Sequence, residues 1–260
     1  MSKPLPLFYR DFGKGEPIVI LHGLFGSSDN WLSQGKILSE KYRVILVDLR
    51  NHGQSPHDDV NDYPTMAGDV KALLDLLKIK PIHLMGHSMG GKVAIQFSLL
   101  YPEYLKSLTV VDIAPKKYPM HHDRIMEGLK AIPIQTLESR NMADSHLQNY
   151  VSNQGIRQFL LKNLLRMPDG HFQWKINIPI LERNLGYLLG MEFTSGVFDK
   201  PSLFIRGARS NYVEPGDEKY IFPLFPTAQI VSLDTGHWVH SEKPEEFLHT
   251  VFTFLENLKA

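Results

Sequence analysis

The stretch Gly86-His87-Ser88-Met89-Gly90 decides how the rest of the sequence is interpreted. It follows an apolar segment at residues 82–85 that predicts a strand, and it opens residues 88–100, which predict a helix. Glycines two residues before and two residues after the serine allow a tight strand-to-helix turn, because a side chain at either place would collide with its neighbours. Such a turn lifts the Ser88 hydroxyl above the sheet. Glycine-flanked serines also occur in ordinary surface turns, but the position between a strand and a helix favours a nucleophile.

Apolar segments and segments with helical periodicity alternate on both sides of this turn. Before residue 114, strands are predicted at 5–10, 17–21, 42–49, 82–85 and 105–111, and helices at 65–77, with Thr65 as N-cap, and at 88–100. After Pro201 the alternation resumes, with strands at 202–206 and 228–233 and helices at 214–224 and 244–258. This order predicts an α/β fold with a mostly parallel central sheet and helices on both faces.

The alternation stops between residues 114 and 200. Helices are predicted there at 136–149 and 152–165, followed by the turn Pro168-Asp169-Gly170 and a mixed segment at 171–178. This pattern predicts a helical cap at residues 115–200, inserted into one α/β core formed by residues 1–114 and 201–260. Two consecutive domains fit the pattern less well, because the alternation after residue 200 continues that of the first part.

Composition narrows the classes of function. The chain has 260 residues, with 28 Lys and Arg against 28 Asp and Glu, so its net charge near neutral pH is zero. A balanced charge argues against nucleic acid or an anionic membrane as the main partner. The absence of cysteine excludes disulfides, thiolate metal sites and a cysteine nucleophile. No apolar run approaches the length of a membrane span. The sequence therefore predicts a soluble, cytoplasmic protein; it leaves the oligomeric state open.

A serine nucleophile needs a base, and His237 is the best placed of the twelve histidines. It lies in Asp234-Thr235-Gly236-His237-Trp238, directly after the last predicted strand. Because the carboxyl ends of parallel strands meet at one edge of a sheet, His237 and Ser88 are expected to approach each other. His240 is the rival, but it lies inside the following segment. Six other histidines show neither the H-x-x-x-H spacing nor the adjacent carboxylates of a metal site, so no metal is predicted; they are His52, His57, His121, His122, His146 and His171.

The loop His22-Gly23-Leu24-Phe25-Gly26 follows the predicted strand at 17–21. From there a backbone N–H can point toward the space above Ser88. The N–H groups of Leu24 and Met89 are therefore predicted to form a two-donor oxyanion hole, in which each donor typically contributes about 2.7–4 kcal/mol to catalysis. Taken alone, this loop is an ordinary glycine-rich strand exit, and only its pairing with the serine turn supports the prediction.

Together these three motifs resemble the α/β-hydrolase fold family, and the resemblance covers nearly the whole chain. In most members the catalytic acid follows the strand after the cap, in the pattern G-x-x-D-x-x-V. The matching stretch here is Gly207-Ala208-Arg209-Ser210-Asn211-Tyr212-Val213, with Ser210 where the aspartate is expected. The usual acid is therefore missing, and another carboxylate has to be found.

Asp112, in Val110-Val111-Asp112-Ile113-Ala114-Pro115, is the preferred replacement. It ends the strand after the serine helix, at the same edge of the sheet. This relocation of the acid is similar to that of the YbfF-type bacterial esterases. The sequence stretches at 48–56 and 172–181 are also similar to those of that family. Asp234 and Asp217 are the alternatives, and a carboxylate that only caps a loop is the non-catalytic interpretation of Asp112. The predicted triad is Ser88, His237 and Asp112.

The resemblance implies a serine carboxylesterase or thioesterase that acts on short to medium acyl esters, with acyl-CoA as a further candidate, through an acyl-enzyme and without a cofactor. Small-molecule contacts are expected from Phe25, Trp174 and Trp238, although most cap residues also suit a core of the cap itself. A basic run could meet the phosphates of CoA, while a solvated surface is the simpler interpretation; its members are Lys116, Lys117, His121, His122 and Arg124.

Two other functions remain open from the sequence. The same residues suit a non-hydrolytic enzyme of this fold, such as a lyase or an acyltransferase. A ligand-binding protein with low turnover is the second alternative, although an intact serine, histidine and aspartate weigh against it.

Overall fold

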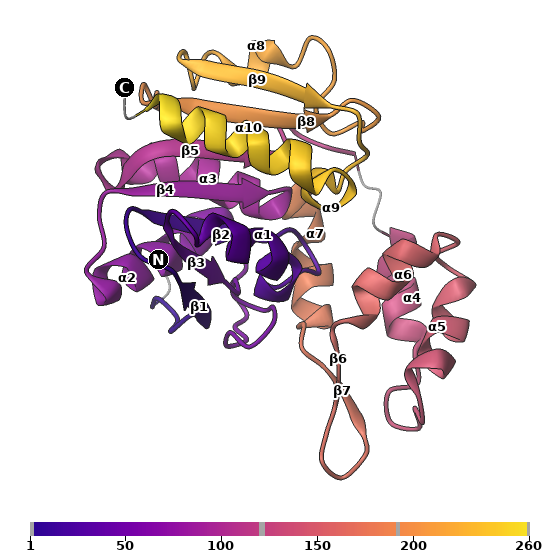
Figure 1. Ribbon diagram of the computed structural model, residues 1–260. Coiled ribbons are helices and arrows are strands. Elements are labelled where there is room, and N and C mark those ends of the chain that lie inside the picture. Colours follow the sequence, from indigo (N-terminus) through magenta and orange to yellow (C-terminus); the bar gives the residue numbers. More distant parts are fainter. Residues whose placement is uncertain (1–2, 120–122, 191–192, 259–260) are drawn as a thin grey trace.

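The computed structural model describes residues 3–119, 123–190 and 193–258. A seven-stranded sheet in the order β1-β3-β2-β4-β5-β8-β9 forms its centre (Figure 1). Only β1 runs antiparallel to its neighbour, so the predicted mostly parallel sheet is confirmed. The strands are β1 (Tyr9–Phe12), β2 (Pro17–Leu21), β3 (Arg43–Val47), β4 (Ile82–His87), β5 (Leu105–Val111), β8 (Ser202–Gly207) and β9 (Ala228–Leu233).

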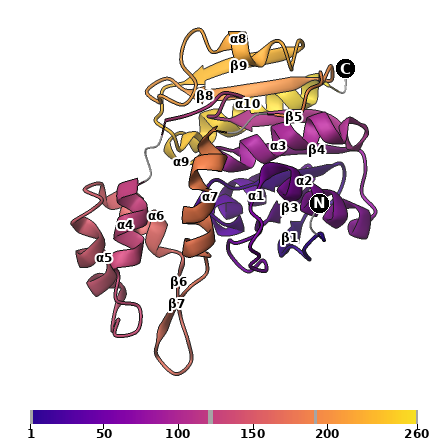
Figure 2. The same cartoon turned by 180° about the vertical axis from the view of Figure 1, so that it is seen from behind.

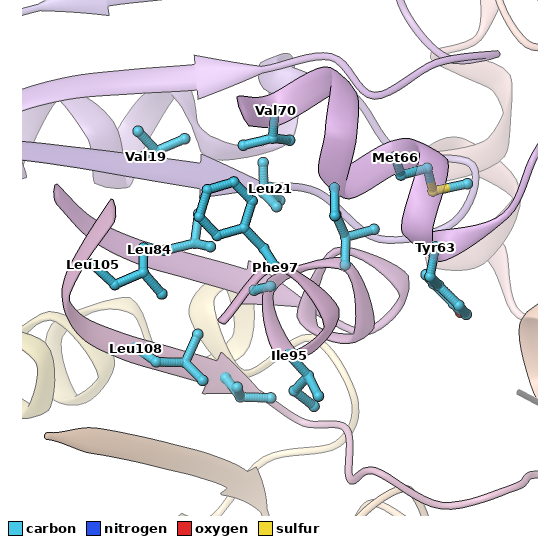
Figure 3. Packing of buried hydrophobic residues seen from close by; sticks show 14 of the residues in the cluster. Val19, Leu21, Tyr63, Met66, Val70, Leu84, Ile95, Phe97, Leu105 and Leu108 are labelled. Carbon is cyan, nitrogen blue, oxygen red and sulfur yellow. The ribbon is translucent and has the colours of Figure 1, made fainter. Parts of the chain in front are cut away.

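Helices cover both faces of the sheet, because alternate residues of the buried strands point to opposite sides. On one face, Val19 and Leu21 pack with the side chains of α2 (Tyr63–Leu77) and α3 (Met89–Leu100), as Figure 3 shows. On the other face, Ile18 and Ile20 share a core with α1 (Leu32–Leu38) and α10 (Pro244–Asn257). The remaining short helices of this part are Ser28–Trp31, Pro102–Tyr104, α8 (Glu218–Ile221) and α9 (Val239–Glu242).

Between β5 and β8 the chain forms a separate group of helices, seen from both sides in Figures 1 and 2. They have a hydrophobic cluster largely of their own, with Leu129, Leu147, Leu160 and Leu181 among its buried members. Figure 1 shows the group beyond the carboxyl ends of the strands, where the residues after β2, β4 and β5 also lie. The elements are α4 (Asp123–Ala131), α5 (Arg140–Gln148), α6 (Gln154–Leu161), β6 (Leu164–Arg166), β7 (Phe172–Trp174) and α7 (Ile178–Gly190). The boundaries at 114/115 and 200/201 stay predictions.

Several predicted elements have other bounds in the structure. The helix expected at 65–77 begins at Tyr63, and its N-cap is Asp62, whose carboxylate accepts a hydrogen bond of 2.7 Å from the Thr65 N–H. The helix expected at 136–149 begins only at Arg140, behind the Ser139 cap. The helix expected at 152–165 ends at Leu161, after which a strand begins, and the one expected at 214–224 keeps a single turn, α8.

Four of the described α-helices were not predicted from the sequence: α1, α4, α7 and α9. Pro179 interrupts the apolar pattern of α7, yet it occupies the second position of the helix, where proline is tolerated because that N–H has no partner within the helix. Within the described ranges, none of the helices has the length and the apolar character needed to cross a bilayer.

Candidate active site

The turn that carries Ser88 is held in a conformation that only its flanking glycines permit. Strand β4 continues to His87, two residues further than predicted, and α3 starts at Met89, so Ser88 alone makes the turn, with φ 52° and ψ −118°. A Cβ atom on Gly86 would lie 2.1 Å from the Gly90 carbonyl oxygen, and one on Gly90 would lie 2.5 Å from the His22 carbonyl oxygen. Both glycines are therefore required sterically, and the strain at Ser88 presents its hydroxyl above the sheet.

Three side chains from separate segments form one hydrogen-bonded chain. The Ser88 hydroxyl lies 3.0 Å from His237 Nε2, and His237 Nδ1 lies 2.7 Å from Asp112 Oδ2. Because an ionised carboxylate only accepts, Nδ1 carries the hydrogen and Nε2 is free to take the serine proton. Asp112 is fully buried at the end of β5, and His237 follows β9, so the sheet edge brings all three together.

Asp112 is held by two further donors. The Gly207 N–H donates to Oδ1 over 2.9 Å, and the Ser210 hydroxyl donates to Oδ2 over 2.5 Å. Sequence reasoning identified Ser210 as the residue at the usual acid position, but it missed that this hydroxyl contacts the relocated carboxylate. The chain of hydrogen bonds therefore has four members, in the order Ser88, His237, Asp112 and Ser210.

The alternative acids and base lie elsewhere. Asp234 pairs with Arg209, and its side chain is 74% exposed. Asp217 pairs with Lys116 over 2.6 Å. The ring of His240 is buried and stacks on Trp31 with centroids 4.0 Å apart, and the contact with the Ser88 hydroxyl is made by His237 instead.

The loop after β2 lies against the serine. A Cβ atom on Gly23 would be 3.2 Å from the Ser88 Cβ. In this loop the Phe25 N–H donates to His52 Nε2 and the Gly26 N–H donates to the Gly23 carbonyl, whereas the Leu24 N–H has no partner among the described residues. The Met89 N–H opens α3 and has no acceptor within the helix. These are the two donors predicted for an oxyanion hole, and that role stays a prediction.

Comparison with known proteins decides the family. A family model described as the alpha/beta hydrolase fold matches residues 16–244. The chain belongs to the α/β-hydrolase fold family. The predicted fold class is thereby confirmed.

Relatives within the α/β-hydrolase family match almost end to end. The mouse sn-1-specific diacylglycerol lipase ABHD11 is 40% identical, with 97% of this chain and 86% of that protein covered. The Escherichia coli esterase YbfF is 36% identical, with 93% of each covered. A solved structure titled marine microorganism esterase has a TM-score of 0.93 and 38% identity, and the match covers 96% of this chain and 99% of that one. The expected resemblance to YbfF-type esterases is confirmed.

A pocket opens beside Ser88 between the α/β-hydrolase core and α7. Its wall is apolar and aromatic apart from Lys92 and Ser88; the lining residues are Leu24, Tyr63, Ser88, Met89, Lys92, Ile113, Tyr118, Leu185, Leu188, Leu189 and Tyr212. The three predicted substrate contacts are not among them. Phe25 is buried in the cluster of the cap, Trp174 packs against that cluster, and Trp238 packs on Phe159, so their role in substrate binding stays a prediction.

The predicted basic run is largely engaged in other contacts or cannot be placed. Lys116 pairs with Asp217, and the Arg124 guanidinium donates to the Asn149 carbonyl. His121 and His122 lie outside the described residues. Among the residues that the structure does describe, no group of three or more His, Asp or Glu side chains is arranged to hold a metal ion.

Two further rings fix the position of His237. Tyr212 stacks on its imidazole with centroids 3.9 Å apart, and His87 Nε2 donates to its main-chain carbonyl over 2.9 Å. Burial, followed by the nearby His237 and His240, holds the pKa of His87 well below its ordinary value. His87 is therefore neutral at physiological pH, which keeps a positive charge away from the His237 ring.

The buried His240 gives the protein a measurable acid sensitivity. Burial lowers its pKa to about 3, so between its ordinary value near 6.5 and about 3 the unfolded chain binds a proton that the folded chain does not. The contribution of His240 to the free energy of unfolding is fully present above pH 6.5. It is lost as the pH falls below 6.5, by up to about 1.4 kcal/mol per pH unit. His240→Phe keeps the ring stack on Trp31 and removes the titration. Urea unfolding near pH 7 and pH 5 should show a smaller loss of stability in the variant; equal losses would contradict this account.

Proposed function

We propose that the protein is a serine ester hydrolase that works through an acyl-enzyme on Ser88. The observation that carries this proposal is the unbroken hydrogen-bonded chain from the Ser88 hydroxyl through His237 to the buried Asp112. The names of the relatives, a diacylglycerol lipase and an esterase, support hydrolysis of carboxylic esters.

In the first half of the reaction, Ser88 Oγ attacks the carbonyl carbon of the ester while His237 Nε2 takes its proton. Asp112 keeps the Nδ1 tautomer and stabilises the imidazolium that forms. The negative charge on the carbonyl oxygen is stabilised by the N–H groups of Leu24 and Met89. The imidazolium then gives its proton to the leaving alcohol, and the acyl group stays on the serine. Water clears the acyl group by the same route.

The proposed substrates are esters with short to medium acyl chains, and acyl-CoA thioesters are a further candidate. The apolar pocket beside Ser88, with Leu185 and Leu188 from the cap, suits an acyl chain. A thiol leaves more easily than an alcohol, so the same residues would cleave a thioester without additional groups.

A chain-length series tests this proposal. The wild type should hydrolyse p-nitrophenyl esters of two to eight carbons faster than the sixteen-carbon ester, and butyryl-CoA should be cleaved at a measurable rate. Product analysis with added ethanol separates hydrolysis from acyl transfer, since an acyltransferase would form ethyl butyrate in preference to butyrate. A folded protein that cleaves none of these compounds would contradict the proposal and favour a lyase or a binding protein.

A further inference from the structure

Lys92 is a buried lysine without a carboxylate partner among the described residues. It is only 2% exposed. The part of the chain that the structure describes has two other buried lysine or arginine side chains, and each pairs with an aspartate, Arg50 with Asp69 and Arg157 with Asp144. A buried charge is costly unless it is paired, which makes an isolated ammonium in a protein interior unusual. Its presence needs an explanation.

The groups around the ammonium are neutral. Lys92 Nζ donates to the carbonyl oxygens of Leu188 and Leu189 over 3.0 and 3.2 Å. The rings of Tyr118 and Tyr63 lie with their centroids 4.9 and 5.8 Å from it. The carbonyls belong to the last turn of α7, where the helix dipole places a partial negative charge. These contacts stabilise the cation only in part, and they use two of the three ammonium hydrogens.

The position of Lys92 connects this charge with the proposed nucleophile. It lies in the first turn of α3, and its main-chain N–H donates to the Ser88 carbonyl over 3.1 Å, so the two residues are neighbours across one helical turn. Long helical side chains lean toward the helix N-terminus, so the stem of Lys92 runs toward the serine. Both residues line the same pocket, where Lys92 carries the only basic group among the lining side chains that the structure describes.

We propose that Lys92 pairs with a carboxylate of the substrate, so that the preferred substrates are esters or thioesters with a second, ionised acid group a few carbons from the ester bond. This inference rests on the proposed hydrolysis at Ser88. It names the substrate class, because Ser88 and Lys92 line the same pocket, so that one small substrate can reach both side chains. Burial lowers the pKa of Lys92 to about 7, and a bound carboxylate would favour the charged form.

Paired substrates that differ only in charge test the proposal. The first pair is ethyl hydrogen glutarate and its neutral amide, ethyl glutaramate, which place the charge on the acyl side. The second pair is the butyrate ester of 3-hydroxypropanoate and that of 3-hydroxypropanamide, which place it on the alcohol side. In at least one pair, the wild type should show a kcat/KM ratio of charged to neutral substrate that falls at least tenfold in Lys92→Met.

Two variants separate charge from architecture. Lys92→Gln can still donate to the α7 carbonyls but carries no charge, and it should lose the selectivity as Lys92→Met does. Lys200→Met is the matched control, because Lys200 also donates to two main-chain carbonyls, those of Pro102 and Leu105, and does not line the pocket. It should keep the wild-type ratio. If both substrates of each pair lose the same factor in the Lys92 variants, Lys92 only holds α7 and the proposal is wrong.

A binding measurement keeps the inference distinct from the proposed hydrolysis. Calorimetry with monomethyl glutarate on Ser88→Ala protein should detect binding that weakens at least tenfold when Lys92→Gln is added. If monomethyl glutarate binds both proteins equally and the wild type still hydrolyses neutral esters, the proposed role of Lys92 is wrong while the proposed hydrolysis stands. Binding that depends on Lys92 in a protein that hydrolyses no ester would instead overturn the proposed reaction.

Discussion

Ser88→Ala is expected to lower kcat for p-nitrophenyl butyrate by a factor on the order of 10⁶, the loss typical of removing a serine nucleophile from an intact triad. The reason is that no other hydroxyl contacts His237 Nε2 among the described residues. The variant should fold normally, because alanine preserves the Cβ and the strained turn depends on Gly86 and Gly90. Steady-state rates and the thermal transition, measured on the same preparation, check both expectations.

Ser98→Ala is the matched control for this change. Ser98 lies in the same helix, and its hydroxyl donates to the Ile95 carbonyl, away from the pocket. The control should keep its rate within a few fold. A Ser88→Ala protein that retained a tenth of the wild-type rate would contradict a covalent role for this serine.

Asp112→Asn is expected to reduce kcat by about 10⁴ while the fold persists. An asparagine amide can present a donor to His237 Nδ1, which favours the wrong tautomer and leaves Nε2 protonated. The asparagine also has only one side-chain oxygen, so either the Gly207 N–H or the Ser210 hydroxyl loses its acceptor. The pH dependence of kcat should change with it, since the imidazolium loses its stabilising carboxylate.

Two companion variants make this result specific. Asp234→Asn removes the nearest rival carboxylate in sequence, which is exposed and paired with Arg209, and should leave kcat within about twofold. Ser210→Ala removes one donor to Asp112 and should cost roughly tenfold to a hundredfold, the range of a hydrogen bond to a charged group. If Asp234→Asn were the damaging change, the assignment of the acid would be wrong.

Much of this site could be predicted from the sequence, because a parallel sheet fixes where the residues after each strand lie. The alternation of strands and helices puts the residues after each strand at one sheet edge, so Ser88, Asp112 and His237 could be placed together without coordinates. The absence of an aspartate at Ser210 was itself informative, because it directed attention to Asp112. The sequence predicted the fold class for the same reason, since long apolar strands such as residues 42–49 leave few alternatives.

The cap and the pocket could not be predicted as well. Helix α7 begins with an isoleucine and a proline, which hide its start, and its buried residues pack on two surfaces at once. Nothing in the local sequence distinguishes Lys92 from a solvent-exposed lysine, and only its tertiary contacts with the Leu188 and Leu189 carbonyls show its burial in the pocket. The bond between Ser210 and Asp112 joins residues 98 positions apart, beyond the reach of local patterns.

An acyl-enzyme on Ser88 can be detected by mass spectrometry of protein quenched in acid during turnover of p-nitrophenyl butyrate. One added butyryl group per chain is expected, located on the peptide that contains Ser88 and absent from Ser88→Ala. His237→Ala protein that has been acylated with an activated ester should keep the group for longer, because water is no longer deprotonated. Turnover with no adduct in either protein, or with a butyryl group on another residue, would contradict the account.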